Sequence, residues 1–171
     1  MVERFGSHCV AAQLPIGAEA EFEGIIDLVR QTSIIWPDAD DPRAMVEGPI
    51  PEAMAEEAEE AREALLERLA DVDDDFAMAY LEDSEALEVE TILDAIRAAV
   101  LRGDLVPVLC GTALRNKGVQ PLLNAIVRWL PSPDDIEDVS GTQPDGEGTE
   151  TRASDPKAPM SALAYKVAIM E

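Results

Sequence analysis

The sequence of 171 residues has few aromatic side chains, two cysteines and one histidine. Aromatic residues make up only 4%, so leucine, isoleucine, valine and alanine must build the core that a hydrophobic content of 47% allows. His8 is the only histidine, which excludes a histidine-rich metal site. Cys9 and Cys110 lie far apart and form no CxxC pair, which indicates two free thiols in a reducing compartment.

Basic residues and long apolar runs are also scarce. Lysine and arginine number 13 against 36 acidic residues, for a net charge of -23. A surface this acidic repels phosphate backbones, so we expect no direct binding of nucleic acid by this chain. Every apolar run is short and interrupted by charges or proline, so we expect no membrane span and a soluble, cytoplasmic protein. The acidic side chains either keep the protein soluble or form a docking face for a protein partner.

The remaining residues predict strands near the two ends of the chain and in its middle. Residues 10–17 read as an extended segment, and residues 22–36 contain two runs rich in β-branched residues, separated from the next helix by a loop over residues 37–51. The apolar stretch LVPVLC at residues 105–110 has the length of a buried strand. Residues 162–169 alternate like a further strand.

Apolar residues at spacings of three and four predict four helices. The first begins near Pro51 and continues to Val72, a second lies around residues 76–80, a third spans residues 89–102 and ends at Gly103, and a fourth covers residues 117–130. On the first helix a row of carboxylates lies opposite the apolar stripe, formed by Glu56, Glu60, Glu63 and Glu67.

The strand, turn and helix over residues 105–130 are a candidate ligand site. In open α/β sheets, ligands bind beyond the carboxyl ends of strands, where backbone N–H groups are free. The small residues Gly111, Thr112 and Ala113 let a ligand approach the backbone closely. Spacing alone also fits a turn that only connects two elements.

Several stretches together resemble bacterial elongation factor G, a translational GTPase, in the order and spacing of that family. They are QLPIGAE (residues 13–19), GIIDLV (24–29), VPVLCGTA (106–113), NKGVQPLL (116–123), WLPSP (129–133) and SALAYK (161–166). The resemblance covers almost the whole chain. It begins in the middle of the family's GTPase domain, so we expect an internal segment of that protein.

The resemblance implies an α/β fold with four parts. Residues 1–18 and 98–133 would form the C-terminal part of a P-loop GTPase domain, and residues 19–97 an α+β subdomain inserted into it. Residues 134–159, which are polar and almost free of large apolar side chains, would be a linker. Residues 160–171 would be the first strand of the β-barrel domain that follows.

The resemblance also implies a nucleotide-binding role for three residues. The family's last guanine-binding loop is a Ser-Ala pair, matched here by Thr112 and Ala113; the backbone N–H of Ala113 would face guanine O6, and Leu114 would pack beside the base. The phosphate-binding pattern GxxxxGK[ST] is absent from the sequence. We therefore expect GTP and Mg²⁺ to bind the full-length parent enzyme, a GTPase, and neither to bind this chain alone. No catalytic or metal-ligating residue is assigned here.

The inserted subdomain of the family faces the stalk region of the large ribosomal subunit. The row Glu56, Glu60, Glu63 and Glu67 is therefore the candidate contact surface for that partner. A segment of a GTP-dependent ribosomal translocation factor is thus the first hypothesis. The alternatives are an acidic protein-binding module without nucleotide function and a translational GTPase of the ribosomal-protection type.

Overall fold

The structure is a computed structural model that describes residues 8–37, 44–84, 86–135, 138–143, 146–155, 157–160 and 162. These residues form a mixed α/β fold, as predicted. The chain divides into two compact units, Met1–Leu130 and Pro131–Glu171. In the described part, no helix is both long and apolar enough to cross a membrane.

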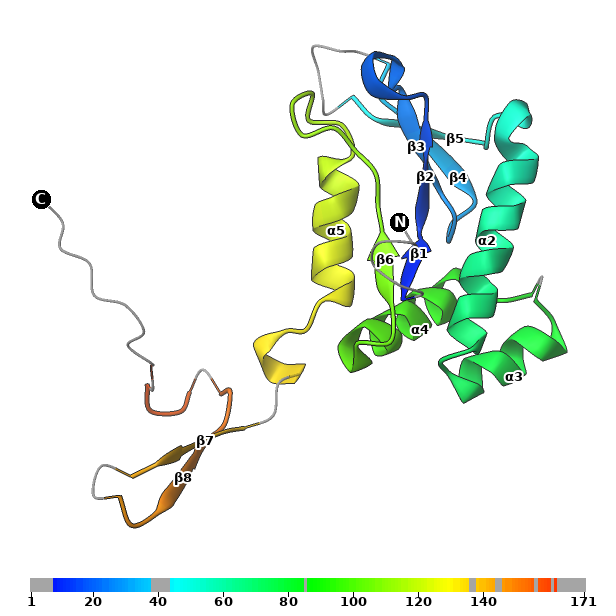
Figure 1. Ribbon diagram of the computed structural model, residues 1–171. Coiled ribbons are helices and arrows are strands. Elements are labelled where there is room, and N and C mark those ends of the chain that lie inside the picture. Colours follow the sequence, from blue (N-terminus) through cyan, green and yellow to red (C-terminus); the bar gives the residue numbers. More distant parts are fainter. Residues whose placement is uncertain are drawn as a thin grey trace, which may run out of the picture. The chain divides into compact units, whose positions relative to one another are not determined.

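One extended segment near the start of the first unit belongs to two sheets. Its first half, β1 (Cys9–Ala11), pairs in parallel with β6 (Val106–Val108), and its second half, β2 (Gln13–Ile16), pairs antiparallel with β3 (Gly24–Asp27). Between them, Ala12 donates its N–H to Val108 O at 3.0 Å and accepts from Leu28 N at 3.1 Å. The segment therefore ties the strand that precedes the candidate site to the antiparallel sheet (Figure 1).

The antiparallel sheet has the strand order β2-β3-β4-β5. The predicted strands in residues 22–36 are confirmed as β3 and β4 (Thr32–Ile35). The predicted loop over residues 37–51 was partly wrong, because it contains β5 (Val46–Gly48), which pairs with β4. This short strand is specified by its partner rather than by its own pattern, and Ser33 Oγ donates to Pro49 O at 2.8 Å beside it.

The three helices predicted between Pro51 and Gly103 are confirmed. They are α2 (Ala55–Ala70), preceded by the 3-10 turn η2 (Glu52–Met54), then α3 (Asp74–Glu82) and α4 (Val89–Arg102). The side chain of Asp73 caps α3 by accepting from Phe76 N at 3.0 Å. Gly103, with φ 81°, ends α4 in the left-handed conformation that glycine adopts without steric cost.

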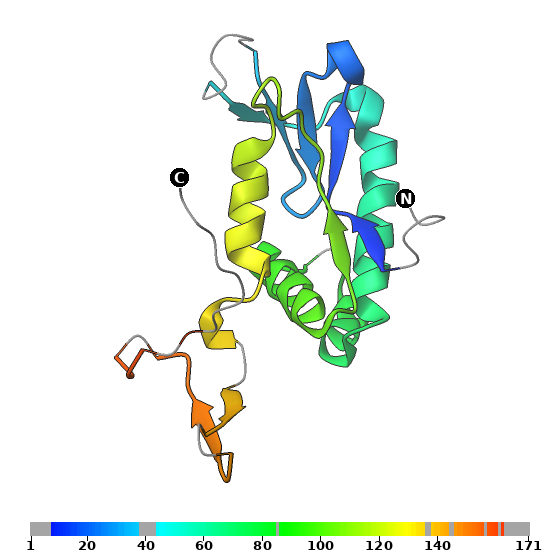
Figure 2. The same cartoon turned by 60° about the vertical axis from the view of Figure 1, so that its left-hand side comes forward.

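The main core joins the sheets to the helices. In both views α2 and α5 (Val119–Trp129) lie on opposite sides of the β1–β6 pair (Figures 1 and 2). The largest side chains that are almost completely buried are aliphatic, as the low aromatic content predicts: Ile25, Ile26, Leu28, Leu65, Leu69, Ile92, Ile96 and Leu105. Leu65 and Leu69 belong to the apolar stripe predicted for α2, and this side of the helix packs against the core.

The predicted helix over residues 117–130 is confirmed as α5, but most of its apolar side remains exposed. Only Ala125 and Trp129 are buried, while the larger aliphatic residues are from 42% to 83% exposed, namely Leu122, Leu123, Ile126 and Val127. Leu130, just after the helix, is 49% exposed. No described part of the chain covers this side of α5, so an apolar stripe here does not mark the core.

The predicted buried strand over residues 105–110 is shorter and more exposed than expected. Only Val106–Val108 is strand, and Val106 is 51% exposed. Among the described residues β6 pairs with β1 alone, so its other edge has no strand beside it. Leu105, just before the strand, is buried, so the apolar run enters the core at its first residue and continues as an edge strand.

The second unit contains a hairpin that the sequence did not predict. After the 3-10 turn η3 (Pro133–Asp135), β7 (Val139–Thr142) pairs antiparallel with β8 (Thr149–Arg152), within the stretch interpreted as a linker. None of the residues of these strands is buried, so the polar composition correctly indicated that no core forms here. The strand predicted for residues 162–169 lies outside the described residues except for Ala162.

Candidate functional site

The three residues predicted to bind nucleotide lie together in a tight turn that follows β6. Thr112 N donates to Lys117 O at 2.9 Å and Lys117 N donates to Thr112 O at 3.2 Å, which closes the 112–117 turn (residues 112–117). Inside it, Asn116 N donates to Ala113 O at 3.1 Å. These bonds hold Thr112, Ala113 and Leu114 at the carboxyl end of a parallel strand, where ligands bind in α/β sheets.

The tip of the 112–117 turn faces solvent. Ala113 is exposed and Leu114 is 96% exposed, although a large aliphatic side chain is usually covered. The N–H of Ala113 meets no acceptor among the described residues. The turn therefore presents a free backbone donor beside an uncovered apolar side chain, a pairing suited to a flat ring with an acceptor at its edge.

Two glycines allow the segments that enter and leave the 112–117 turn to lie close together at its base. A Cβ atom on Gly111 would lie 2.8 Å from Lys117 O, and one on Gly118 would lie 2.7 Å from Cys110 O. Both distances are shorter than side-chain carbons tolerate, and Gly118 also has a φ of 81°. Residues at these two positions must therefore lack a side chain for the turn to close.

The side chains that anchor the 112–117 turn were missed by the sequence analysis. Arg115 Nη1 donates to Ala20 O at 2.8 Å, and the buried Lys117 donates through Nζ to Phe22 O at 3.3 Å. At the foot of the turn Cys110 N donates to the side chain of Gln13 at 3.3 Å. Each contact joins residues more than ninety positions apart, and no local pattern in the sequence signals them.

Cys110, next to the turn, is a partly buried thiol. Burial raises the pKa of the Cys110 thiol to about 11, because desolvation disfavours the thiolate. It packs instead against the small cluster of Phe22, Ile25 and Trp36. Both cysteines are free, as the sequence predicts.

A separate pocket of about 280 Å³ lies between the antiparallel sheet and α5. Its wall includes Asp27, Arg30 and Arg128 above an apolar floor that contains Trp129. Three of its charged groups have partners: Arg30 pairs with Asp27 at 3.1 Å, and Arg128 pairs with Asp94 at 2.9 Å and also with Glu90. The carboxylate of Glu47 also lines the pocket. The two arginines that line the pocket therefore already have carboxylate partners.

No group of three or more potential metal-ligating side chains occurs within the part of the chain that the structure describes. We therefore assign no metal ligand from the geometry of these residues.

The second candidate site is the row of glutamates on α2. The structure places Glu56, Glu60, Glu63 and Glu67 on that helix, and all four are exposed. Ala58, Leu65 and Leu69 on the same helix are buried, so the helix separates into an apolar side and an acidic side. The prediction that the row faces away from the core is confirmed; its use as a contact surface is not decided by exposure.

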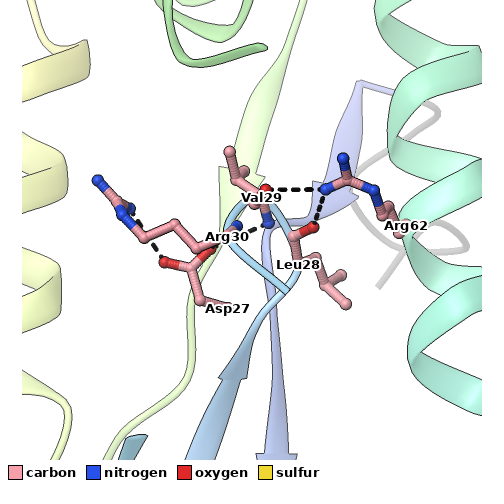
Figure 3. Close-up of polar contacts among 5 residues, drawn as sticks. All are labelled: Asp27, Leu28, Val29, Arg30 and Arg62. Carbon is pink, nitrogen blue, oxygen red and sulfur yellow. Dashed lines mark hydrogen bonds and ion pairs between the residues drawn. The ribbon is translucent and has the colours of Figure 1, made fainter. Parts of the chain in front are cut away.

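Arg62 fixes this helix to the turn between β3 and β4. Its Nη1 donates to Leu28 O at 2.5 Å and to Val29 O at 2.8 Å. Burial lowers the pKa of Arg62, and the nearby Asp27 carboxylate opposes that shift. On the other side of the same turn, Asp27 accepts from Val29 N at 3.0 Å and Arg30 N at 2.9 Å (Figure 3). The acidic row is thus carried on a helix with a defined position.

Comparison with known proteins supports the α/β fold but identifies no family for this chain. No family model matches the chain. A crystal structure of a protein from Thermus thermophilus is similar, with a TM-score of 0.66 and 26% sequence identity, over 80% of this chain and 20% of that chain. The chain therefore spans about a fifth of the length of the solved protein it matches. The shared structure is a mixed α/β arrangement.

Proposed function

We propose that this chain is a segment of a translational GTPase similar to elongation factor G and contributes the last guanine-binding loop of that enzyme. The 112–117 turn carries this proposal. It follows a parallel strand, has the Thr-Ala pair at its tip, and leaves the N–H of Ala113 without an acceptor among the described residues. In the parent, that N–H donates to guanine O6 and Leu114 covers one side of the base.

Two open surfaces of the first unit support a larger α/β domain. The edge of β6 opposite β1 has no described strand beside it. The neighbouring helix α5 exposes a continuous set of aliphatic side chains, which water disfavours. A parallel sheet is normally covered on both faces. Further strands of a GTPase domain would pair with the open edge of β6 and cover α5, and the parent would supply the phosphate-binding loop and Mg²⁺ site that this chain lacks.

The experiment is to express the longest product of the reading frame that contains this chain and to titrate it with a fluorescent GDP. The proposal expects micromolar or tighter binding that excess GTP competes away and ATP does not. A product that includes GxxxxGK[ST] yet fails to bind GDP would overturn the proposal. A frame without any phosphate-binding loop would instead favour an acidic protein-binding module.

The acidic row on α2 is proposed as the contact with stalk proteins of the large ribosomal subunit. The row is exposed and the helix is held by Arg62, so a partner would meet an ordered surface. Changing Glu56, Glu60, Glu63 and Glu67 to glutamine should weaken binding to isolated stalk protein, and raised salt should do the same. The matched control removes four exposed carboxylates elsewhere: Asp74, Asp75, Glu82 and Glu88. Equal losses in both variants would mean that net charge alone, rather than this surface, drives binding.

A further inference from the structure

The 112–117 turn is held by two cationic side chains that reach the same short segment of the chain. Arg115 contacts Ala20 O at 2.8 Å and Lys117 contacts Phe22 O at 3.3 Å. Both acceptors lie in residues 18–22, the 18–22 segment, which connects β2 to β3. Two independent donors from one turn therefore meet two carbonyl groups of one segment, a geometry that restricts both position and rotation of the turn.

Lys117 is an unusual residue for this purpose because it is only 7% exposed. Removing an ammonium group from water is costly unless hydrogen bonds compensate. Its backbone is occupied by the two hydrogen bonds that close the turn, and its side chain extends to the 18–22 segment. Lys117 thus closes the turn through its backbone and joins the turn to a second element through its side chain.

The 18–22 segment is itself a firm support. Glu21 N donates to Ala18 O at 2.9 Å in the 3-10 turn η1 (Glu19–Glu21), and Glu23 N donates to Ile16 O at 2.9 Å. Phe22 is 8% exposed and packs with Ile25 and Trp36. The carbonyl groups that accept from Arg115 and Lys117 are therefore held in place by backbone bonds and by a small apolar cluster.

We infer that Arg115 and Lys117 are positioning residues that set the orientation of the Ala113 N–H by anchoring the 112–117 turn to the 18–22 segment. The consequence for nucleotide binding rests on the proposed function; the anchoring itself does not. A preorganised donor loses less conformational freedom when a ligand binds, so a loosened turn lowers affinity even though neither side chain touches the base. Guanine affinity then depends on the β2–β3 connection, which belongs to the inserted subdomain.

The first test follows the order of the turn in this chain by amide hydrogen exchange. The variants are Arg115→Met, Lys117→Met and the conservative Arg115→Lys, with Arg152→Met in the second unit as control. Loss of one anchoring hydrogen bond should speed exchange at the Thr112, Asn116 and Lys117 amides by about three- to tenfold. Amides in the middle of α4 should keep their rates, which separates a loosened turn from general destabilisation.

The conservative variant Arg115→Lys distinguishes a positioning role of the hydrogen bond from a simple packing role of the side chain. Arg115→Lys keeps a cationic hydrogen-bond donor on a long side chain, so we expect its turn amides to exchange within about twofold of the original chain. Because Arg115 is exposed, its variants should fold even if Lys117→Met does not. Unchanged exchange at the turn in Arg115→Met would overturn the inference, as would equal acceleration in Arg115→Met and Arg152→Met.

The second test measures release of fluorescent GDP from the longer product of the reading frame. Arg115→Met should speed release by about three- to tenfold, and Arg115→Lys should restore it. If the turn loosens but the longer product binds no GDP at all, the anchoring stands and the proposed function fails. If GDP binds and its release is the same in Arg115→Met despite a loosened turn, the positioning role for guanine binding is overturned.

Discussion

At the scale of single residues, the proposed guanine contact of the 112–117 turn depends on one backbone N–H group. The N–H of Ala113 is the donor that the proposed function assigns to guanine, and the residue is exposed. In the longer product, Ala113→Pro should weaken GDP binding by about 1–3 kcal/mol, because it removes a hydrogen bond in a site that the base desolvates. Ala113→Ser keeps the N–H and is the control. Affinities within twofold for all three proteins would place the guanine contact elsewhere.

The Cys110 thiol predicts a dependence of stability on alkaline pH. Burial raises the pKa of the Cys110 thiol from its ordinary value of 9.0 to about 11, so the fold favours the protonated form. This contribution to stability is complete below pH 9 and is lost as pH rises to 11, because the unfolded chain releases the proton first. Denaturant midpoints between these pH values should fall more for the original chain than for Cys110→Ala. Parallel curves would contradict the assigned burial.

At the scale of elements, Arg62 is the polar contact that sets α2 on the antiparallel sheet. Its removal leaves the carbonyl groups of Leu28 and Val29 without a donor beside a partly buried helix surface. Arg62→Met should lower the free energy of unfolding by about 1–3 kcal/mol in urea titrations. Arg30→Met, on the other side of the same turn, loses an exposed ion pair and should cost less than about 1 kcal/mol. The reverse order of the two effects would be incompatible with the contact described.

The exposed side of α5 should behave as an uncovered apolar surface in this chain. Leu123 is 54% and Val127 is 83% exposed, so replacing both with glutamine should leave the unfolding midpoint nearly unchanged. The same change should lower the fluorescence of Nile red, an uncharged dye that this acidic protein does not repel. Val139→Gln, an exposed apolar site in the hairpin, is the control and should have a smaller effect. A large loss of stability in the α5 variant would show that the helix face is covered.

At the scale of the whole molecule, the chain has the turn proposed to contact guanine but lacks the phosphate-binding pattern GxxxxGK[ST]. We therefore expect the isolated chain not to bind nucleotide. One or two backbone contacts to guanine do not offset the freedom that a nucleotide loses on binding, and a net charge of -23 repels its phosphates. Calorimetric titration with GTP or GDP should give no heat of binding at micromolar protein. A micromolar dissociation constant for the isolated chain would mean that it contains a complete site.

Local sequence patterns were sufficient to predict the elements whose apolar side chains pack into the core. The helices α2, α3 and α4 were predicted from the spacing of apolar residues, and the strands β3 and β4 from runs rich in β-branched residues. All of them contribute side chains to the two apolar clusters of the first unit. The site residues Thr112, Ala113 and Leu114 were found through family resemblance, since a short turn of small residues has no distinctive pattern. The strand β5 and the hairpin β7–β8 were missed, because pairing with a neighbouring strand rather than apolar spacing specifies them.

The amino-acid sequence by itself determined an aliphatic core, two free thiols, an acidic helix face and a Thr-Ala turn after an apolar strand. Only the tertiary structure decided that α5 leaves its apolar side uncovered and that Arg115 and Lys117 reach Ala20 and Phe22. The physical reason is distance along the chain. Periodicity reports which side of an element is apolar but not whether another element covers it. The carbonyl groups that accept from Arg115 and Lys117 lie 95 residues away in the sequence and are brought close only by the fold.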